Sequence, residues 1–312
     1  MRAFVFPGQG AQTIGMGAGL ASAFRDARDV FDQVDEALGE NLSGLIWEGE
    51  IADLTLTQNA QPALMATSLA VMAALGSEGV HIDAASFVAG HSLGEYSALA
   101  AAGAISIADT ARLLRKRGTA MQEAVPVGQG AMAAILGLSL EQVQDVAAQA
   151  AGEGVCQAAN DNDPAQVVVS GDKAAIERAV VIAKEAGAKR AMLLPVSAPF
   201  HCEMMGPAAQ AMAGALADVQ INAPVVPVVS NVRASSVSDP DEIRSLLVQQ
   251  ITGSVRWRES VMYMASEGVS ETWEIGAGKA LSGMVRRIDN SVETRAISGP
   301  DDIKAAVEAV AG

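Results

Sequence analysis

SFVAGHSLGEYSALAAAGA, residues 86–104, contains a short apolar run, the motif Gly90-His91-Ser92-Leu93-Gly94 and an alanine-rich helical pattern, in that order. This order predicts a strand, a sharp turn and a helix. In a G-x-S-x-G turn the glycines leave room where side chains would collide, and the serine hydroxyl stands clear of the sheet at a helix N-terminus. Ser92 is therefore a candidate nucleophile, and the alternative is a tight turn with a solvated serine.

A serine hydroxyl needs a base, and histidine is the usual one. The chain has three histidines. His81 lies in a polar loop, and His91 adjoins Ser92 on a turn where neighbouring side chains point apart. His201, in APFH (198–201), remains as the candidate base, with an ordinary loop histidine as the alternative. No acidic residue stands out as its orienter, because the three between the serine and the histidine are interpreted as turn residues: Asp161, Asp163 and Asp172.

The two outer parts of the chain, residues 1–126 and 203–312, alternate apolar strand patterns with helical patterns. Such alternation predicts one mostly parallel sheet in an α/β fold. Pro62 is expected near the start of its helix. The expected strands are 3–6, 85–89, 225–231 and 272–276, and the expected helices are 20–38, 62–79, 106–123, 239–251 and 257–267.

The middle of the chain, residues 127–202, differs in pattern. Its elements follow the order β-α-β-β-α-β, which is typical of a ferredoxin-like α+β unit. We therefore expect a small subdomain inserted into the α/β core, with His201 at the junction, where clefts are common. The expected strands are 131–138, 155–160, 166–171 and 191–197, and the expected helices are 139–150 and 173–187.

The amino-acid composition limits the classes of function that this protein can have. Of 312 residues, 50% are hydrophobic and 18% are charged, which is typical of a compact globular enzyme. The net charge of −15 and the lack of a basic cluster argue against nucleic-acid binding. Two cysteines, Cys156 and Cys202, suggest neither a metal site nor a disulfide framework. We see no signal peptide and no segment as long as a membrane span, so a cytoplasmic location is expected.

Two further segments carry candidate binding groups. The loop PGQGAQ (7–12) follows the first strand, and its glycines let backbone N–H groups approach a ligand closely. It is a candidate for half of an oxyanion hole, with the N–H of Leu93 as the other half, or else an ordinary turn. Arg115, Lys116 and Arg117 are either a solvated charged face or the source of one arginine that clamps a carboxylate.

Together these segments closely resemble malonyl-CoA:acyl carrier protein transacylases. The resemblance spans nearly the whole chain, in the order of that family. The matching segments are FPGQGAQ (6–12), TQNAQPAL (57–64), GHSLGEYSALAAAGA (90–104), RG (117–118), GAMAAILG (130–137), AAND (158–161), VSAPFHCEMM (196–205), SN (230–231) and EIGAGKAL (274–281).

The resemblance implies an α/β-hydrolase-like core with a ferredoxin-like insert, and a role for each candidate residue. Ser92 would carry the malonyl ester, with His201 as its base and the backbone carbonyl of Gln250 orienting that histidine. The N–H groups of Gln9 and Leu93 would form the oxyanion hole. Two side chains would bind substrate: Arg117 would hold the free malonyl carboxylate, and Phe200, like Leu93, favours malonyl over other acyl groups.

The implied reaction moves malonyl from malonyl-CoA to the phosphopantetheine thiol of an acyl carrier protein, for fatty-acid or polyketide chain extension. No bound cofactor or metal is implied, because the phosphopantetheine belongs to the partner, and a monomer is expected. Two alternatives stay open. A serine esterase or thioesterase would share the serine and its base but not Arg117 or the PGQGAQ loop. A catalytically inactive carrier-binding subunit would not need both Ser92 and His201.

Overall fold

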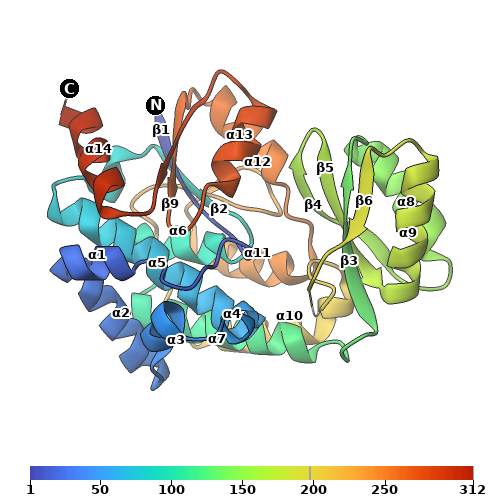
Figure 1. Ribbon diagram of the computed structural model, residues 1–312, viewed down its shortest axis with the longest axis horizontal. Coiled ribbons are helices and arrows are strands. Elements are labelled where there is room, and N and C mark those ends of the chain that lie inside the picture. The colour runs from blue at the N-terminus through green and yellow to red at the C-terminus, as the bar shows by residue number, and fades with distance from the viewer. Residues whose placement is uncertain (197, 312) are drawn as a thin grey trace.

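The computed structural model describes residues 1–196 and 198–311 and contains two separate sheets (Figure 1). The larger sheet has six strands in the order β10-β9-β1-β2-β7-β8, and all neighbours are parallel except β7 and β8. The α/β class predicted from the sequence is therefore confirmed. The strands are β1 (Arg2–Phe6), β2 (Phe87–Gly90), β7 (Val228–Val229), β8 (Ser236–Val237), β9 (Glu271–Ile275) and β10 (Glu293–Ile297).

Alternate residues of the central strands face two different cores, as the two-residue period of a strand requires. In β1, Phe4 and Phe6 pack on one face, with most of the helices of the larger part. Ala3 and Val5 pack on the other face, against α12 (Trp257–Ser266) and α13 (Ala280–Ile288). The remaining helices of this part are α1 (Ala18–Ala23), α2 (Arg25–Leu38), α3 (Leu42–Glu48), α4 (Ile51–Thr55), α5 (Thr57–Ser77), α6 (Gly94–Ala101), α7 (Ile107–Glu123), α10 (Gly206–Ala217), α11 (Pro240–Thr252) and α14 (Pro300–Ala311).

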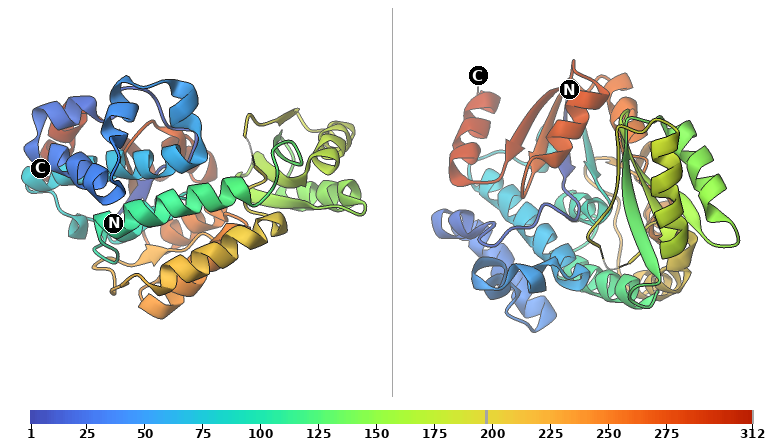
Figure 2. Two further views of the ribbon diagram at one scale, coloured as in Figure 1. Left: turned by 90° about the horizontal axis from the view of Figure 1, so that it is seen from below. Right: turned by 45° about the vertical axis from the view of Figure 1, so that its right-hand side comes forward.

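The smaller sheet is antiparallel, in the order β4-β5-β3-β6, and α8 and α9 pack on one of its faces. The chain leaves the larger part after α7 and returns to α10, and these two helices lie side by side (Figure 2). The expected β-α-β-β-α-β order is present. The elements are β3 (Gly130–Leu136), α8 (Leu140–Ala151), β4 (Cys156–Asp163), β5 (Gln166–Asp172), α9 (Lys173–Glu185) and β6 (Arg190–Leu193). The domain boundaries at 126/127 and 202/203 stay a prediction.

Helix α5 differs from its prediction in two ways. It begins at Thr57, so Pro62 lies inside it instead of near its start. Proline has no N–H to donate to the carbonyl four residues earlier, which is that of Gln58. Arg115 donates to this carbonyl instead, at 2.7 Å, and so satisfies the freed acceptor. With 21 residues α5 is also long and apolar enough to cross a membrane, contrary to the sequence expectation, but most of it is buried against neighbouring helices.

The interpretation of Asp161 and Asp163 as turn residues is wrong, because β4 continues to Asp163, and Asp172 is the last residue of β5. Asp161 and Asp163 are buried carboxylates in the strand, not turn residues. Their charges are balanced from the larger part of the molecule: Arg258 of α12 lies 2.9 Å from Asp161, and Arg287 of α13 lies 2.8 Å from Asp163. The fourth strand of this unit, β6, is shorter than predicted and ends at Leu193. The last residue of the predicted strand, Ser197, lies outside the described residues.

Candidate active site

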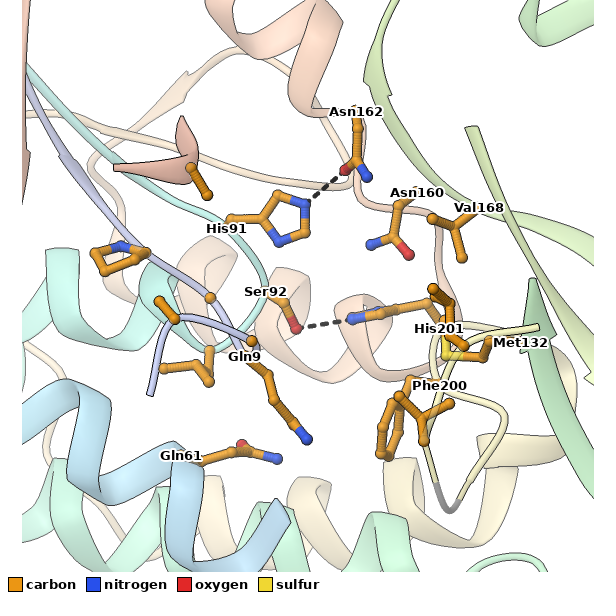
Figure 3. Close-up of a pocket in the computed structure, with 18 of the residues that line it drawn as sticks. Gln9, Gln61, His91, Ser92, Met132, Asn160, Asn162, Val168, Phe200 and His201 are labelled. Carbon is orange, nitrogen blue, oxygen red and sulfur yellow. Dashed lines mark hydrogen bonds between the residues drawn. The ribbon is translucent and has the colours of Figure 1, made fainter. Parts of the chain in front are cut away.

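A cavity of about 540 Å³ lies where the ends of β1 and β2 meet the smaller sheet. Figure 3 shows its labelled side chains, with Ser92 and His201 pointing toward one another. Both parts of the molecule contribute to its lining. The larger part supplies Gln9, Gln61, His91, Ser92, Leu93 and Arg117, and the segment from the smaller sheet to the return helix supplies Met132, Asn160, Asn162, Val168, Phe200 and His201.

The serine lies on the strained turn that its motif predicts. Ser92 has a φ of 54°, which is uncommon for a residue with a side chain. A Cβ atom at Gly90 would lie 1.9 Å from the backbone of Gly94, and one at Gly94 would lie 2.2 Å from the carbonyl oxygen of Phe6. Both positions therefore require glycine, and the turn directs the hydroxyl into the cavity.

The predicted partner of the serine lies within hydrogen-bonding distance. Ser92 Oγ is 2.8 Å from Nε2 of His201, and Nδ1 of His201 is 2.9 Å from the carbonyl oxygen of Gln250. Because a carbonyl only accepts, Nδ1 carries the proton and Nε2 has a free lone pair for the hydroxyl proton. Burial, reinforced by the positive charge of Arg117, lowers the pKa of His201 to about 3, so the ring is neutral at ordinary pH.

Arg117 is buried beside the serine, so the interpretation as a solvated face fails for this residue. Its side chain is 1% exposed, and it donates to Ser92 Oγ at 3.1 Å, to Gln61 Oε1 at 2.7 Å and to Gln250 Oε1 at 2.8 Å. Among the described residues no carboxylate forms an ion pair with it, and its Nε–H has no partner. Arg115, two residues earlier, instead pairs with Glu40 at the surface.

Gln9 and Leu93 both line the cavity, and within the described chain no protein group accepts a hydrogen bond from the backbone N–H of either residue. The N–H of Ser92 is not available, because it donates to Asn231 Oδ1 at 2.7 Å. The Gln9 side chain accepts from Thr57 at 2.9 Å, which holds its loop against α5. Phe200 also lines the cavity.

Three polar residues of the site were not singled out from the sequence. Asn231 holds the turn through the N–H of Ser92 and the carbonyl of Gly90, at 2.7 and 2.6 Å. Glu95, in the first turn of α6, is 2% exposed and accepts from Gln250 Nε2 at 2.7 Å and from Asn231 N at 3.1 Å. Gln61 holds Arg117. All three residues lie in segments that carry the family resemblance: Asn231 in SN, Glu95 in GHSLGEYSALAAAGA and Gln61 in TQNAQPAL.

The other two histidines do not contact the Ser92 hydroxyl. His91 Nε2 pairs with Asn162 Oδ1 at 2.8 Å and points away from the Ser92 hydroxyl, as expected for neighbours on this turn. Burial lowers the pKa of His91. His81 is exposed at the start of a short 3-10 helix. Of the three histidines, only His201 contacts the serine hydroxyl.

Comparison with known proteins agrees with this geometry. The model of the acyl transferase domain family matches residues 3–296. A malonyl CoA-acyl carrier protein transacylase of Bacillus subtilis is 47% identical over 98% of this chain and 96% of its own length. The crystal structure of acyl-carrier-protein-S-malonyltransferase from Bartonella henselae is 52% identical, with a TM-score of 0.98, covering 100% of this chain and 99% of that one.

A further solved structure holds a type II PKS acyl-carrier protein in complex with its malonyl-transacylase. It is 41% identical to this chain, with a TM-score of 0.96, and 99% of each chain is covered. The family model and these relatives span nearly the whole sequence, and the serine motif lies in the matched region. This chain therefore belongs to the acyl transferase domain family.

Proposed function

We propose that this protein transfers a malonyl group from malonyl-CoA to the phosphopantetheine thiol of an acyl carrier protein, through an ester on Ser92. The observation that carries the proposal is Arg117, a buried cation without a carboxylate partner in the described chain, 3.1 Å from the Ser92 hydroxyl. An unpaired buried guanidinium is costly, and the free carboxylate of a malonyl group would relieve that cost. An acetyl group would leave it unpaired, so the site favours malonyl.

In the first half of the reaction His201 Nε2 takes the Ser92 proton while Oγ attacks the thioester carbonyl. Negative charge develops on the carbonyl oxygen, which is placed to accept hydrogen bonds from the N–H groups of Gln9 and Leu93. When the tetrahedral intermediate collapses, the carbon–sulfur bond breaks and His201 returns the proton to the coenzyme A sulfur. The malonyl group is then an ester of Ser92.

In the second half the carrier's thiol gives its proton to His201 and attacks the ester, and the proton ends on Ser92 as the ester bond breaks. The orienter of His201 is the neutral carbonyl of Gln250 and not a carboxylate. A neutral orienter stabilises the imidazolium less than an aspartate would. We infer that this, with exclusion of water from the buried site, limits hydrolysis of the malonyl ester before the carrier arrives.

The acceptor is assigned as an acyl carrier protein because relatives of closely similar length carry that partner in their names, and one is solved with it bound. The transfer needs no cofactor of its own, since both thiols belong to the substrates. We further propose that the protein acts in the cytoplasm as a monomer. A thioesterase shares the serine and histidine, but it needs no buried cation beside the nucleophile.

The test is to incubate the protein with malonyl-CoA and measure its intact mass. We expect a malonyl adduct, mapped to Ser92 by peptide analysis and absent from Ser92→Ala. On addition of carrier protein bearing phosphopantetheine, the adduct should move to the carrier. Release of coenzyme A at the same rate with or without carrier, with free malonate as the product, would identify a thioesterase instead.

A further inference from the structure

Glu95 is a buried acid that, like Arg117, forms a hydrogen bond with the Gln250 side chain, yet the two do not meet. Both residues are described, and no ion pair within 4.0 Å joins them. Glu95 is 2% exposed and Arg117 is 1% exposed, so water screens neither charge well. Two opposite buried charges that share one side-chain amide would normally pair directly, because each offsets the desolvation cost of the other. Something must hold them apart.

The side-chain amide of Gln250 lies between them. Its Oε1 accepts from Arg117 Nη2 at 2.8 Å, and its Nε2 donates to Glu95 Oε2 at 2.7 Å. Nε2 also donates to the carbonyl of Ser92 at 3.0 Å. The reverse orientation of the amide would place its NH₂ against the guanidinium, donor against donor, and its oxygen against two acceptors. The neighbours therefore fix the amide in the orientation that bridges the charges.

We propose that the Gln250 side chain is a specificity-determining spacer, which prevents Glu95 from neutralising Arg117 and so reserves the guanidinium for the substrate carboxylate. This inference rests on the proposed function and assigns to the side chain of Gln250 a task separate from that of its backbone carbonyl. An uncharged amide satisfies both groups by hydrogen bonding without cancelling the charge of Arg117. Gln61, the other side-chain amide on Arg117, is neutral as well.

Burial raises the pKa of Glu95 to about 7, even though Gln250 and Asn231 both donate to it. Its carboxyl is therefore often neutral, which also leaves Arg117 without a full counter-ion. In a protein without the spacer, direct contact with the guanidinium would favour the ionised carboxylate. Glu95 would then compete with the malonyl carboxylate for Arg117.

The test compares four proteins: the wild type, Glu95→Gln, Gln250→Ala and the double variant. The measured quantity is kcat/KM for malonyl-CoA divided by kcat/KM for acetyl-CoA. Gln250→Ala keeps the backbone carbonyl that orients His201 and opens room for Glu95 to reach Arg117. We expect the ratio to fall at least tenfold in Gln250→Ala and to return to within about threefold of wild type in the double variant, because glutamine cannot neutralise the arginine. Glu95→Gln alone should keep the ratio.

The ratio separates this role from a merely structural one, since a misplaced serine or histidine slows both donors alike. Equal ratios in Gln250→Ala and the double variant, or an unchanged ratio in Gln250→Ala, would overturn the inference. Gln250→Ser replaces the alanine variant if that protein does not fold. Failure of the proposed function looks different: the wild type itself would then show no preference for malonyl and no adduct on Ser92.

Discussion

The imidazole of His201 is held by the backbone carbonyl of Gln250, 2.9 Å from Nδ1, and not by a carboxylate. The base is thus oriented without a buried negative charge beside it. We expect His201→Ala to slow formation of the acyl-serine by about 10³-fold, because the serine loses its proton acceptor. Release of coenzyme A in a single turnover measures this step. His91→Gln is the matched control and should lose less than tenfold, since His91 bonds to Asn162.

The neutral state of His201 predicts how the rate of acyl-serine formation depends on pH. Its pKa is lowered from 6.5 to about 3, so the ring keeps its free lone pair as the pH falls through 6.5. The rate of acyl-serine formation should stay level from pH 8 to about 5, where an ordinary histidine base would lose most of its activity. A single-turnover rate measured across this range tests it. A tenfold fall centred on pH 6.5 would contradict the lowered pKa.

Arg117 and Arg115 lie two residues apart on α7, and we expect their replacement by alanine to have opposite effects on donor preference and on stability. Arg117→Ala should reduce malonyl transfer by about 10²-fold or more while leaving acetyl transfer much less affected. Arg115→Ala should leave the donor preference unchanged and cost about 1–3 kcal/mol of stability, because it frees the carbonyl of Gln58 beside Pro62. Kinetics with both donors and urea unfolding separate the two effects. Equal losses with both donors in Arg117→Ala would refute the carboxylate clamp.

Glu95 couples folding to pH with a definite sign. Its pKa is raised from 4.5 to about 7, so the folded protein binds an extra proton between these values. The stabilisation from this group is complete below pH 4.5 and is lost as the pH rises through 7, by about 3 kcal/mol in total. Glu95→Gln lacks this loss. The free energy of unfolding of Glu95→Gln minus that of the wild type should therefore be more positive at pH 8 than at pH 5. The same difference at both pH values would show that Glu95 is ionised throughout.

The ion pair of Asp163 and Arg287 joins the two parts of the molecule. Asp163 is buried, whereas the Arg287 side chain is half exposed. Arg287→Met leaves a buried carboxylate without its cation and should cost about 2–4 kcal/mol of stability. Asp163→Asn removes the charge and should cost less. Urea unfolding of the two variants decides the order, and a larger loss for Asp163→Asn would mean that the carboxylate is well hydrated.

The sequence analysis correctly predicted those elements that are specified by a local pattern of their own residues. The apolar strand before Gly90 and the serine turn are local patterns, and both are present in the structure. Helix α10 was missed, because GPAAQAMAGALA is rich in small residues and shows no clear polar face. The expected strand at 225–231 shrinks to Val228–Val229, where Pro227 cannot donate to a ladder.

The site residues that lie in sequence motifs could be predicted. Those whose role depends on neighbours from distant parts of the chain could not. His201 followed by elimination among three histidines. Arg117 was one of two candidate arginines until the resemblance singled it out, and the role of Gln250 came only from the resemblance. Glu95 was not singled out, because the groups that donate to it, the Gln250 side chain and the Asn231 N–H, lie 155 and 136 residues away in the sequence. Asp161 resembled a turn residue because the cation that keeps it in a strand, Arg258, comes from another part of the chain.

Gly94 has no side chain, and this affects the spacing of the two proposed oxyanion-hole donors, the N–H groups of Gln9 and Leu93. The carbonyl of Phe6 occupies the place where a Cβ at residue 94 would be, and three residues after Phe6 comes Gln9, while Leu93 adjoins Gly94. The two N–H groups follow different strands, β1 and β2, and at Gly94 these strand ends approach so closely that a Cβ would lie 2.2 Å from the carbonyl oxygen of Phe6. Even a methyl group there would wedge the strand ends apart, so the smallest possible mutation at this position would disable the enzyme without touching either the nucleophile or its base.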